Sequence, residues 1–277
     1  MSDTDKNKFE QLAKDWWRTD IIDMEPNRIR FRGYAIEELI GSVGFSQMIW
    51  LMLRGDIPDE AQASLLEAAL VAGVDHGPQA PSIAIARMAA TCGVDLNNAM
   101  ASALNVLGDV HGGAGEQAVI FYESVRQRIQ SGEDVKTSTS KAIDAFITDG
   151  GKYIPGFGHR FHTKDPRSPR LLELVDVATQ KGKVSGIYAE IGRAIETELT
   201  ERKSRPITMN IDGATAVIYA ELGFPAALAR GLFCLSRQVG ILAHAWEQKC
   251  QGGRNKGPLP KGMLWTYGGE DDRNLKP

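Results

Sequence analysis

The spacing of the apolar residues is the feature that most limits how this chain can fold. Within Phe45–Leu53, and again further along the chain, apolar residues recur at intervals of three and four, which is the pattern of an amphipathic helix. Strand signals are few, because no Asn-Gly or Asp-Gly pair separates two alternating apolar runs. We therefore predict an all-α fold, with extended structure only at Arg28–Phe31 and Pro206–Ile211.

Turn-forming residues divide the helical stretches from one another. Glycine and proline gather at the breaks, which lie at 55–58, 73–81, 112–115, 131–139, 150–158, 165–169 and 223–225. The last stretch, Gln251–Pro277, holds six glycines and three prolines with little periodicity. We predict an irregular tail there, and its aromatic residues Trp265 and Tyr267 lead us to expect that it packs on another surface.

Composition narrows the class of protein. The 277 residues are 43% hydrophobic and 24% charged, which is ordinary globular composition and excludes a disordered or fibrous chain. A net charge of −3 offers no general attraction for nucleic acid or for an anionic membrane. No run approaches the roughly 18 apolar residues of a membrane span, and the three cysteines are too far apart for a zinc site or a disulfide framework. We expect a cytoplasmic protein without nucleic-acid or membrane partners.

Three of the five histidines stand beside glycine in breaks between helices: His76, His111 and His159. Glycine lets the backbone approach a ligand closely, which suits a histidine presented into a cleft. Each of the three alone is equally open to a turn-capping role, but together they favour a functional site. We interpret His162 and His244 as structural, and we expect no metal site because no cysteine or suitably placed carboxylate completes a ligand set.

Charged residues in apolar surroundings extend the set of candidates. Arg167 follows a proline turn, and Arg237 lies in an otherwise apolar helical stretch. A guanidinium in such a place either binds the carboxylate of a ligand or pairs with a structural carboxylate. Asp212 begins an apolar run, where it is either the N-cap of a helix or a partly buried carboxyl group with an altered pKa.

Taken in order, these motifs resemble the citrate synthase superfamily, and most closely the citryl-CoA lyases and the citrate-synthase-like domain of ATP-citrate lyase. The resemblance runs almost end to end. The motifs that carry it are Asp75-His76-Gly-Pro, His111-Gly-Gly-Ala-Gly-Glu, Pro155-Gly-Phe-Gly-His159-Arg, Asp165-Pro-Arg167, Asn210-Ile-Asp212 and Ser236-Arg237.

The resemblance implies a nearly all-helical homodimer or dimer of dimers. It also implies a large domain at 1–113 and 223–277 and a smaller mobile domain at 114–222. By the same resemblance, catalysis falls to His111, His159 and Asp212, and 2-oxo-acid binding to His76, Arg167 and Arg237. Coenzyme A, bound as the substrate thioester and not as a resident cofactor, would contact Gly156, Phe157, Gly158, Arg160, Lys152 and Lys164.

The implied chemistry makes or breaks a carbon–carbon bond beside a thioester carbonyl. Cleavage of a 3-hydroxyacyl-CoA needs a base for the hydroxyl, a hydrogen-bond donor for the enolate oxygen and an acid for the enolate carbon. By resemblance His159, His111 and Asp212 fill these three roles in that order. The same residues run in reverse would condense acetyl-CoA with a 2-oxo acid.

Two departures from the synthase pattern bear on the reaction, the first favouring a lyase and the second concerning the substrate. Asp-His-Gly-Pro at 75–78 resembles the lyase branch, and the chain is shorter than a typical synthase. In addition, no arginine matches the one that in synthases precedes the terminal Tyr-Thr-Gly, so either Lys261 or Arg254 replaces it or the substrate has one carboxylate fewer. We therefore expect cleavage of citryl-CoA or of citramalyl-CoA, whose 2-oxo product is pyruvate. The alternatives are a synthase and a non-catalytic acyl-CoA-binding subunit.

Overall fold

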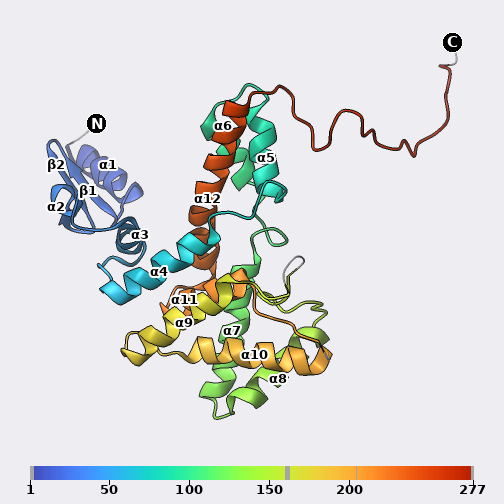
Figure 1. The fold of residues 1–277 in the computed structure, drawn as a ribbon. Coiled ribbons are helices and arrows are strands. Elements are labelled where there is room, and N and C mark those ends of the chain that lie inside the picture. The colour runs from blue at the N-terminus through green and yellow to red at the C-terminus, as the bar shows by residue number, and fades with distance from the viewer. Residues whose placement is uncertain (1–2, 160–162, 204, 276–277) are drawn as a thin grey trace.

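The computed structural model describes residues 3–159, 163–203 and 205–275, and it is built from helices joined by short turns, with one small sheet near the N-terminus (Figure 1). The all-α prediction is confirmed. The helices are α1 (Asp3–Trp16), α2 (Ile36–Leu39), α3 (Phe45–Arg54), α4 (Glu60–Gly73), α5 (Pro81–Ala90), α6 (Leu96–Leu104), α7 (Ala114–Gln130), α8 (Val135–Thr148), α9 (Arg167–Gln180), α10 (Ile187–Lys203), α11 (Ile211–Glu221) and α12 (Ala226–Gln251). The strands are β1 (Ile22–Glu25), β2 (Arg28–Phe31) and β3 (Tyr34–Ala35).

Helix α11 forms the centre of the main core. Its residues 213–220 are all buried, and a helix that is apolar on every side belongs in a protein interior. It packs against α4, α7, α9 and α10. The main apolar cluster accordingly joins residues of α3 and α4 to residues of α7–α12. The proposed domain boundaries at 113/114 and 222/223 stay a prediction.

Helix α12 connects this core to a second one. It rises from the α7–α11 group to α5 and α6 (Figure 1), where Ile83, Ala99 and Ile241 belong to a smaller apolar cluster. By length and composition α12 could cross a membrane. In this structure it packs on α4, α5, α6 and α7 and buries Arg237.

Of the two stretches expected to be extended, one is a strand of the small sheet and the other makes only an isolated bridge. Arg28–Phe31 is β2, which pairs in antiparallel register with β1 across the turn Pro26–Asn27. The sequence analysis missed this hairpin because its turn uses Asn27 at a φ of 63° without the usual glycine. The expectation for Pro206–Ile211 holds in part: Met209 makes an isolated antiparallel bridge with Phe157 and Asn210 is extended, but Ile211 already begins α11.

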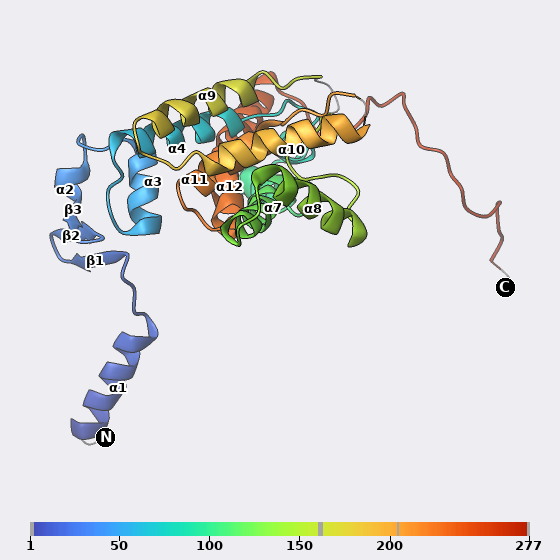
Figure 2. The ribbon, with the colours of Figure 1, turned by 90° about the horizontal axis from the view of Figure 1, so that it is seen from below.

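Both ends of the chain leave apolar side chains exposed. Figure 2 shows α1 standing away from the helical body, and Trp16 and Trp17 near its end are 81% and 82% exposed. The C-terminal stretch is irregular, as predicted, and in its described residues the backbone N–H groups of Asn255 and Lys256 donate to Thr91. Trp265 and Tyr267 remain exposed, so within this chain they do not pack on another surface as expected.

Candidate functional site

The structure brings together the six residues predicted for catalysis and 2-oxo-acid binding, although each comes from a different element. The rings of His76 and His159 meet edge to face, with centroids 5.7 Å apart. The charge of Arg237 lowers the pKa values of His76 and His111 and opposes the rise of the pKa of Asp212, although burial is the largest influence on all three. The site therefore lies where the turns before α5, α7, α9 and α11 meet α12.

A short backbone ladder brings His159 to the start of α11. The N–H of Gly158 donates to the carbonyl oxygen of Thr208 at 2.8 Å, and the side-chain amide of Asn210 donates to the carbonyl oxygen of Gly158 at 2.8 Å. These bonds join the segment that ends in His159 to the segment that leads into Asp212. The two residues therefore meet although 53 positions separate them in the sequence.

Two glycines permit this close approach. A Cβ atom on Gly156 would lie 2.6 Å from the Cα atom of Gly213, and one on Gly213 would lie 2.4 Å from the carbonyl oxygen of Gly156. Neither separation is possible between real atoms, so both positions require glycine. Gly156 also has a φ of 85°, which glycine adopts at the lowest cost.

His111 is held in one tautomer by the start of α5. The backbone N–H of Ser82 donates to His111 Nε2 at 3.2 Å, and the Ser82 hydroxyl lies 3.0 Å from the same nitrogen. Because Nε2 accepts a hydrogen bond, the proton of the neutral ring resides on Nδ1. Burial, and then the charges of Arg237 and His76, lower the pKa of His111. The ring is thus a neutral donor at neutral pH.

Asp212 is not the N-cap of α11. That position belongs to Asn210, whose side-chain oxygen accepts hydrogen bonds from the backbone N–H groups of Asp212 at 3.0 Å and Gly213 at 3.2 Å. The Asp212 carboxyl group is therefore not used in capping. Burial raises its pKa, and the charge of Asp165 acts in the same direction, whereas the charges of the site arginines and of His159 oppose the rise. A carboxyl group in this environment holds a proton more readily than an exposed one.

Arg167 is already paired. Its Nε and Nη2 atoms donate to the two carboxylate oxygens of Asp165 at 2.9 and 2.8 Å, and Asp165 is 1% exposed. Burial alone would raise the pKa of Asp165, but the hydrogen bonds and charge of Arg167 lower it. Of the two interpretations open for Arg167, the structural pair is therefore present, and Nη1 faces the carbonyl oxygen of Ala72 at 3.4 Å.

Arg237 is in a different position. It is 4% exposed, its Nε donates to the carbonyl oxygen of Gly73 at 3.1 Å, and its guanidinium lies 4.7 Å from the ring centre of Phe233. Among the described residues, no carboxylate lies within ion-pair distance of it. Burial lowers its pKa, an effect that the charges of Asp212 and Asp75 oppose. A buried guanidinium without a carboxylate partner is suited to bind an anion.

The residues predicted to bind coenzyme A differ in exposure. Gly156 and Phe157 are buried, and the backbone of Gly158 is used in the ladder to α11. Lys152 is exposed on the loop after α8. Arg160 lies outside the described residues. These assignments stay a prediction.

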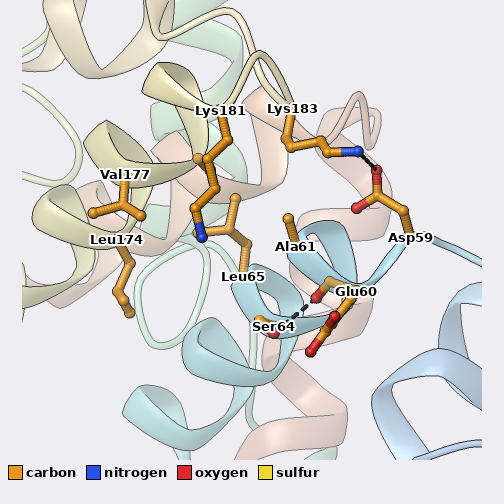
Figure 3. A pocket seen from close by; sticks show the side chains of 10 residues that line it. Asp59, Glu60, Ala61, Ser64, Leu65, Leu174, Val177, Lys181 and Lys183 are labelled. Carbon is orange, nitrogen blue, oxygen red and sulfur yellow. Dashed lines mark hydrogen bonds and ion pairs between the residues drawn. The ribbon is translucent and has the colours of Figure 1, made fainter.

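None of the six residues lines either of two cavities, although the second reaches Asp165, the partner of Arg167. One, of about 570 Å³, lies between the start of α4 and the end of α9 (Figure 3). Two of its lining residues, Lys183 and Asp59, form an ion pair at 3.1 Å. The other, of about 420 Å³, is lined by the predicted CoA ligand Lys164 together with Asp165 and Glu196. In the part of the chain that the structure describes, no group of three histidine, cysteine or acidic residues is arranged to hold a metal.

The sequence analysis missed the residues that orient the site. Ser82, Asp165 and Asn210 were not assigned roles, yet they hold His111, Arg167 and the start of α11. Asn210 gave a usable signal, because an asparagine just before an apolar helical run is a typical N-cap. Ser82 gave none, since its partner His111 lies 29 residues further along the chain.

Comparison with known proteins gives consistent matches. A family model described as citrate synthase, C-terminal domain, matches residues 9–70 and 52–258. The citrate synthase of Haloferax volcanii is 32% identical over 71% of this chain and 49% of its own length, so the chain spans about half the length of such curated relatives. The structure of citryl-CoA lyase from Hydrogenobacter thermophilus has a TM-score of 0.82 and 30% identity, and covers 94% of this chain and 97% of its own. Citrate synthase from Thermoplasma acidophilum, solved with carboxymethyl coenzyme A and oxaloacetate, has a TM-score of 0.68 and 25% identity, over 84% of this chain and 59% of its own.

Proposed function

The chain belongs to the citrate synthase family, and from that premise we propose that it is a carbon–carbon lyase acting on a CoA ester. It splits citryl-CoA, or a close 3-hydroxyacyl-CoA such as citramalyl-CoA, into acetyl-CoA and oxaloacetate or pyruvate. The observation that carries the proposal is structural likeness. Citryl-CoA lyase from Hydrogenobacter thermophilus matches this chain with a TM-score of 0.82 and 30% identity, whereas the citrate synthase of Thermoplasma acidophilum reaches 0.68 and 25%.

Three residues make up what we call the enolate half of the site: His111, His159 and Asp212. His159 takes the proton of the tertiary hydroxyl, the carbon–carbon bond breaks, and the hydroxyl carbon becomes the ketone of the 2-oxo acid. The electron pair moves onto the thioester, whose enolate oxygen accepts a hydrogen bond from Nδ1–H of His111. Asp212 then delivers its proton to the enolate carbon, which gives acetyl-CoA. The raised pKa of Asp212 supports its role as the acid.

The remaining three residues, His76, Arg167 and Arg237, make up what we call the acid half, which binds the 2-oxo acid. Arg237 offers its guanidinium to a carboxylate, in keeping with its burial without a carboxylate partner. Arg167 contributes positive charge to the site while its guanidinium remains paired with the carboxylate of Asp165. The CoA moiety lies along the 150–160 loop, with Lys152, Arg160 and Lys164 as candidate phosphate contacts.

A second candidate is the condensation of acetyl-CoA with a 2-oxo acid, which the names of the curated relatives favour. A non-catalytic acyl-CoA-binding subunit is the third. The geometry around His111 and Asp212 supports catalysis over mere binding, because a hydrogen-bond donor for the enolate oxygen and a carboxyl group with a raised pKa are what the enolate step requires.

A substrate panel tests the proposal. One set of reactions supplies citryl-CoA or citramalyl-CoA, and acetyl-CoA and the 2-oxo acid are measured by mass spectrometry. The other supplies acetyl-CoA with oxaloacetate or pyruvate, and free CoA is measured with a thiol reagent. We expect turnover in the first set. Release of free CoA in the second set alone identifies a synthase, and turnover in neither identifies a binding subunit.

The same proposal includes a second copy of the chain. On α12 the residues Leu235, Val239, Leu242 and Trp246 are exposed, and their spacing of four, three and four places them on one face. The exposed aromatic residues of the tail add to this unpartnered surface. Removal of residues 252–277 is expected to weaken the dimer in sedimentation or to reduce turnover. A truncated chain that stays dimeric at full turnover contradicts this role for the tail.

A further inference from the structure

The segment 73–77, which carries His76, lies along one face of α12. Arg237 Nε donates to the first carbonyl of the segment at 3.1 Å. Gly240 packs so closely that a Cβ atom there would lie 2.2 Å from the second carbonyl oxygen. His244 continues the same face, since positions 237, 240 and 244 are three and four residues apart. The sequence analysis had left His244 as a structural residue.

Two contacts fix how the His244 ring donates. Arg87 Nη1 lies 3.0 Å from His244 Nδ1, and because a guanidinium only donates, Nδ1 accepts. Nε2 then carries a proton, and it lies 3.2 Å from Asp75 Oδ1. Arg87 is itself held by Glu247 and, at 2.8 Å, by Gln251. The ring therefore links Arg87 on α5 to the carboxylate of Asp75, the residue before His76.

Asp75 in turn holds the turn that presents His76. Its Oδ2 accepts the backbone N–H of Gly77 at 3.1 Å, so the side chain closes a loop around His76. Its Oδ1 is buried and makes no hydrogen bond of good geometry among the described residues, and His244 Nε2 lies 3.2 Å from it at ion-pair distance. The contact with His244 therefore adds a side-chain link between this turn and α12, beside the bond from Arg237 to Gly73 and the packing of Gly240.

We propose that His244 is a positioning residue for the acid half: through Nε2 and Asp75 it holds His76 in place for the 2-oxo acid. This inference rests on the proposed function, because it gives His244 a role only if His76 binds such an acid. The alternative is that His244 has a purely structural role and joins α5 to α12 through its contact with Arg87. The two readings assign importance to opposite nitrogens of the same ring.

A matched pair of amide variants separates the two nitrogens. In His244→Asn the side-chain oxygen replaces Nδ1 and can still accept from Arg87, but the side chain is too short to reach Asp75. In His244→Gln the amide nitrogen replaces Nε2 and can donate to Asp75, while the contact with Arg87 is lost. Binding of pyruvate and of oxaloacetate to the 277-residue chain is measured by calorimetry, together with binding of CoA.

We expect His244→Asn to weaken binding of the 2-oxo acid about tenfold, the scale for losing one hydrogen bond to a charged group. His244→Gln should bind it nearly as the wild-type chain does, and CoA affinity should be unchanged in both. The reverse ranking, or equal binding by all three proteins, overturns the positioning role. A wild-type chain that binds neither acid refutes the proposed function and this inference with it, and that outcome is distinct from a failure of His244 alone.

Discussion

In the enolate half of the site, burial and a backbone hydrogen-bond donor favour the neutral forms of the side chains. In the acid half, positively charged side chains provide the affinity for a carboxylate. His111 and Asp212 have pKa values shifted toward their neutral forms, and a backbone N–H sets the tautomer of His111. In the acid half burial also lowers the pKa of His76, but the carboxylate-binding groups are two guanidiniums. That of Arg167 is paired with a buried carboxylate, and that of Arg237 has no carboxylate partner among the described residues. The difference follows the chemistry, since proton transfer needs tuned neutral groups and carboxylate binding needs a desolvated cation.

The largest effect is expected from Asp212→Asn, which removes the group that exchanges a proton with the enolate carbon. We expect kcat to fall roughly 10²–10⁴-fold. Deuterium uptake into the methyl group of acetyl-CoA, with a 2-oxo-acid analogue present, should stop as well. Uptake that persists in this variant would show that Asp212 is not the acid.

A variant of His159 serves as the control within the same half. Exchange at the methyl group needs only His111 and Asp212, so His159→Ala should block carbon–carbon cleavage and spare the exchange. His111→Ala should lose both activities, and its effect combined with Asp212→Asn should be less than additive, since the two act on one intermediate. Loss of exchange in His159→Ala with ligand binding intact contradicts the assignment of roles.

The next largest effect is expected from Arg237→Lys. An ammonium group cannot reproduce the fork of a guanidinium, and we expect a loss of about 2–4 kcal/mol in transition-state binding from kcat/KM. Arg167→Lys should lose less, about 1 kcal/mol, because Asp165 already occupies two of its donors. Equal losses in the two variants would mean that the acid displaces Asp165 from Arg167.

Part of the fold and part of the site could be predicted from the sequence. Helical periodicity predicted the fold class, and ordered motifs predicted six residues that the structure brings together. The pairing of Arg167 with Asp165 was one of two open alternatives, because spacing alone cannot say where a guanidinium points. The contacts of His111 with Ser82 and of His244 with Asp75 were out of reach, since each joins residues 29 or more positions apart through the packing of α5 and α12.

Asp165→Asn tests the charge of the acid half through stability. Arg167 lowers the pKa of Asp165 below its ordinary 3.8, so the carboxylate stabilises the fold fully above that pH, and the contribution is lost as the pH falls through the lowered value. We expect the variant to lose about 2–3 kcal/mol of unfolding free energy at pH 7. In urea denaturation the difference from wild type should shrink toward pH 3, and a difference that does not change with pH would assign the loss to packing.

The smallest effect is expected from Ser82→Ala, which separates the two donors that face His111 Nε2. The variant removes the hydroxyl at 3.0 Å but keeps the backbone N–H at 3.2 Å, and that N–H is sufficient to hold the proton on Nδ1. We expect the activation free energy to rise by about 0.5–1 kcal/mol, which lowers kcat by a factor of roughly two to five. The position is fully buried at the start of α5, so thermal unfolding is measured beside the kinetics to separate a loss of packing. If Ser82→Ala instead matches the loss of His111→Ala, the hydroxyl and not the backbone fixes the tautomer, and the enolate half depends on side chains as the acid half does.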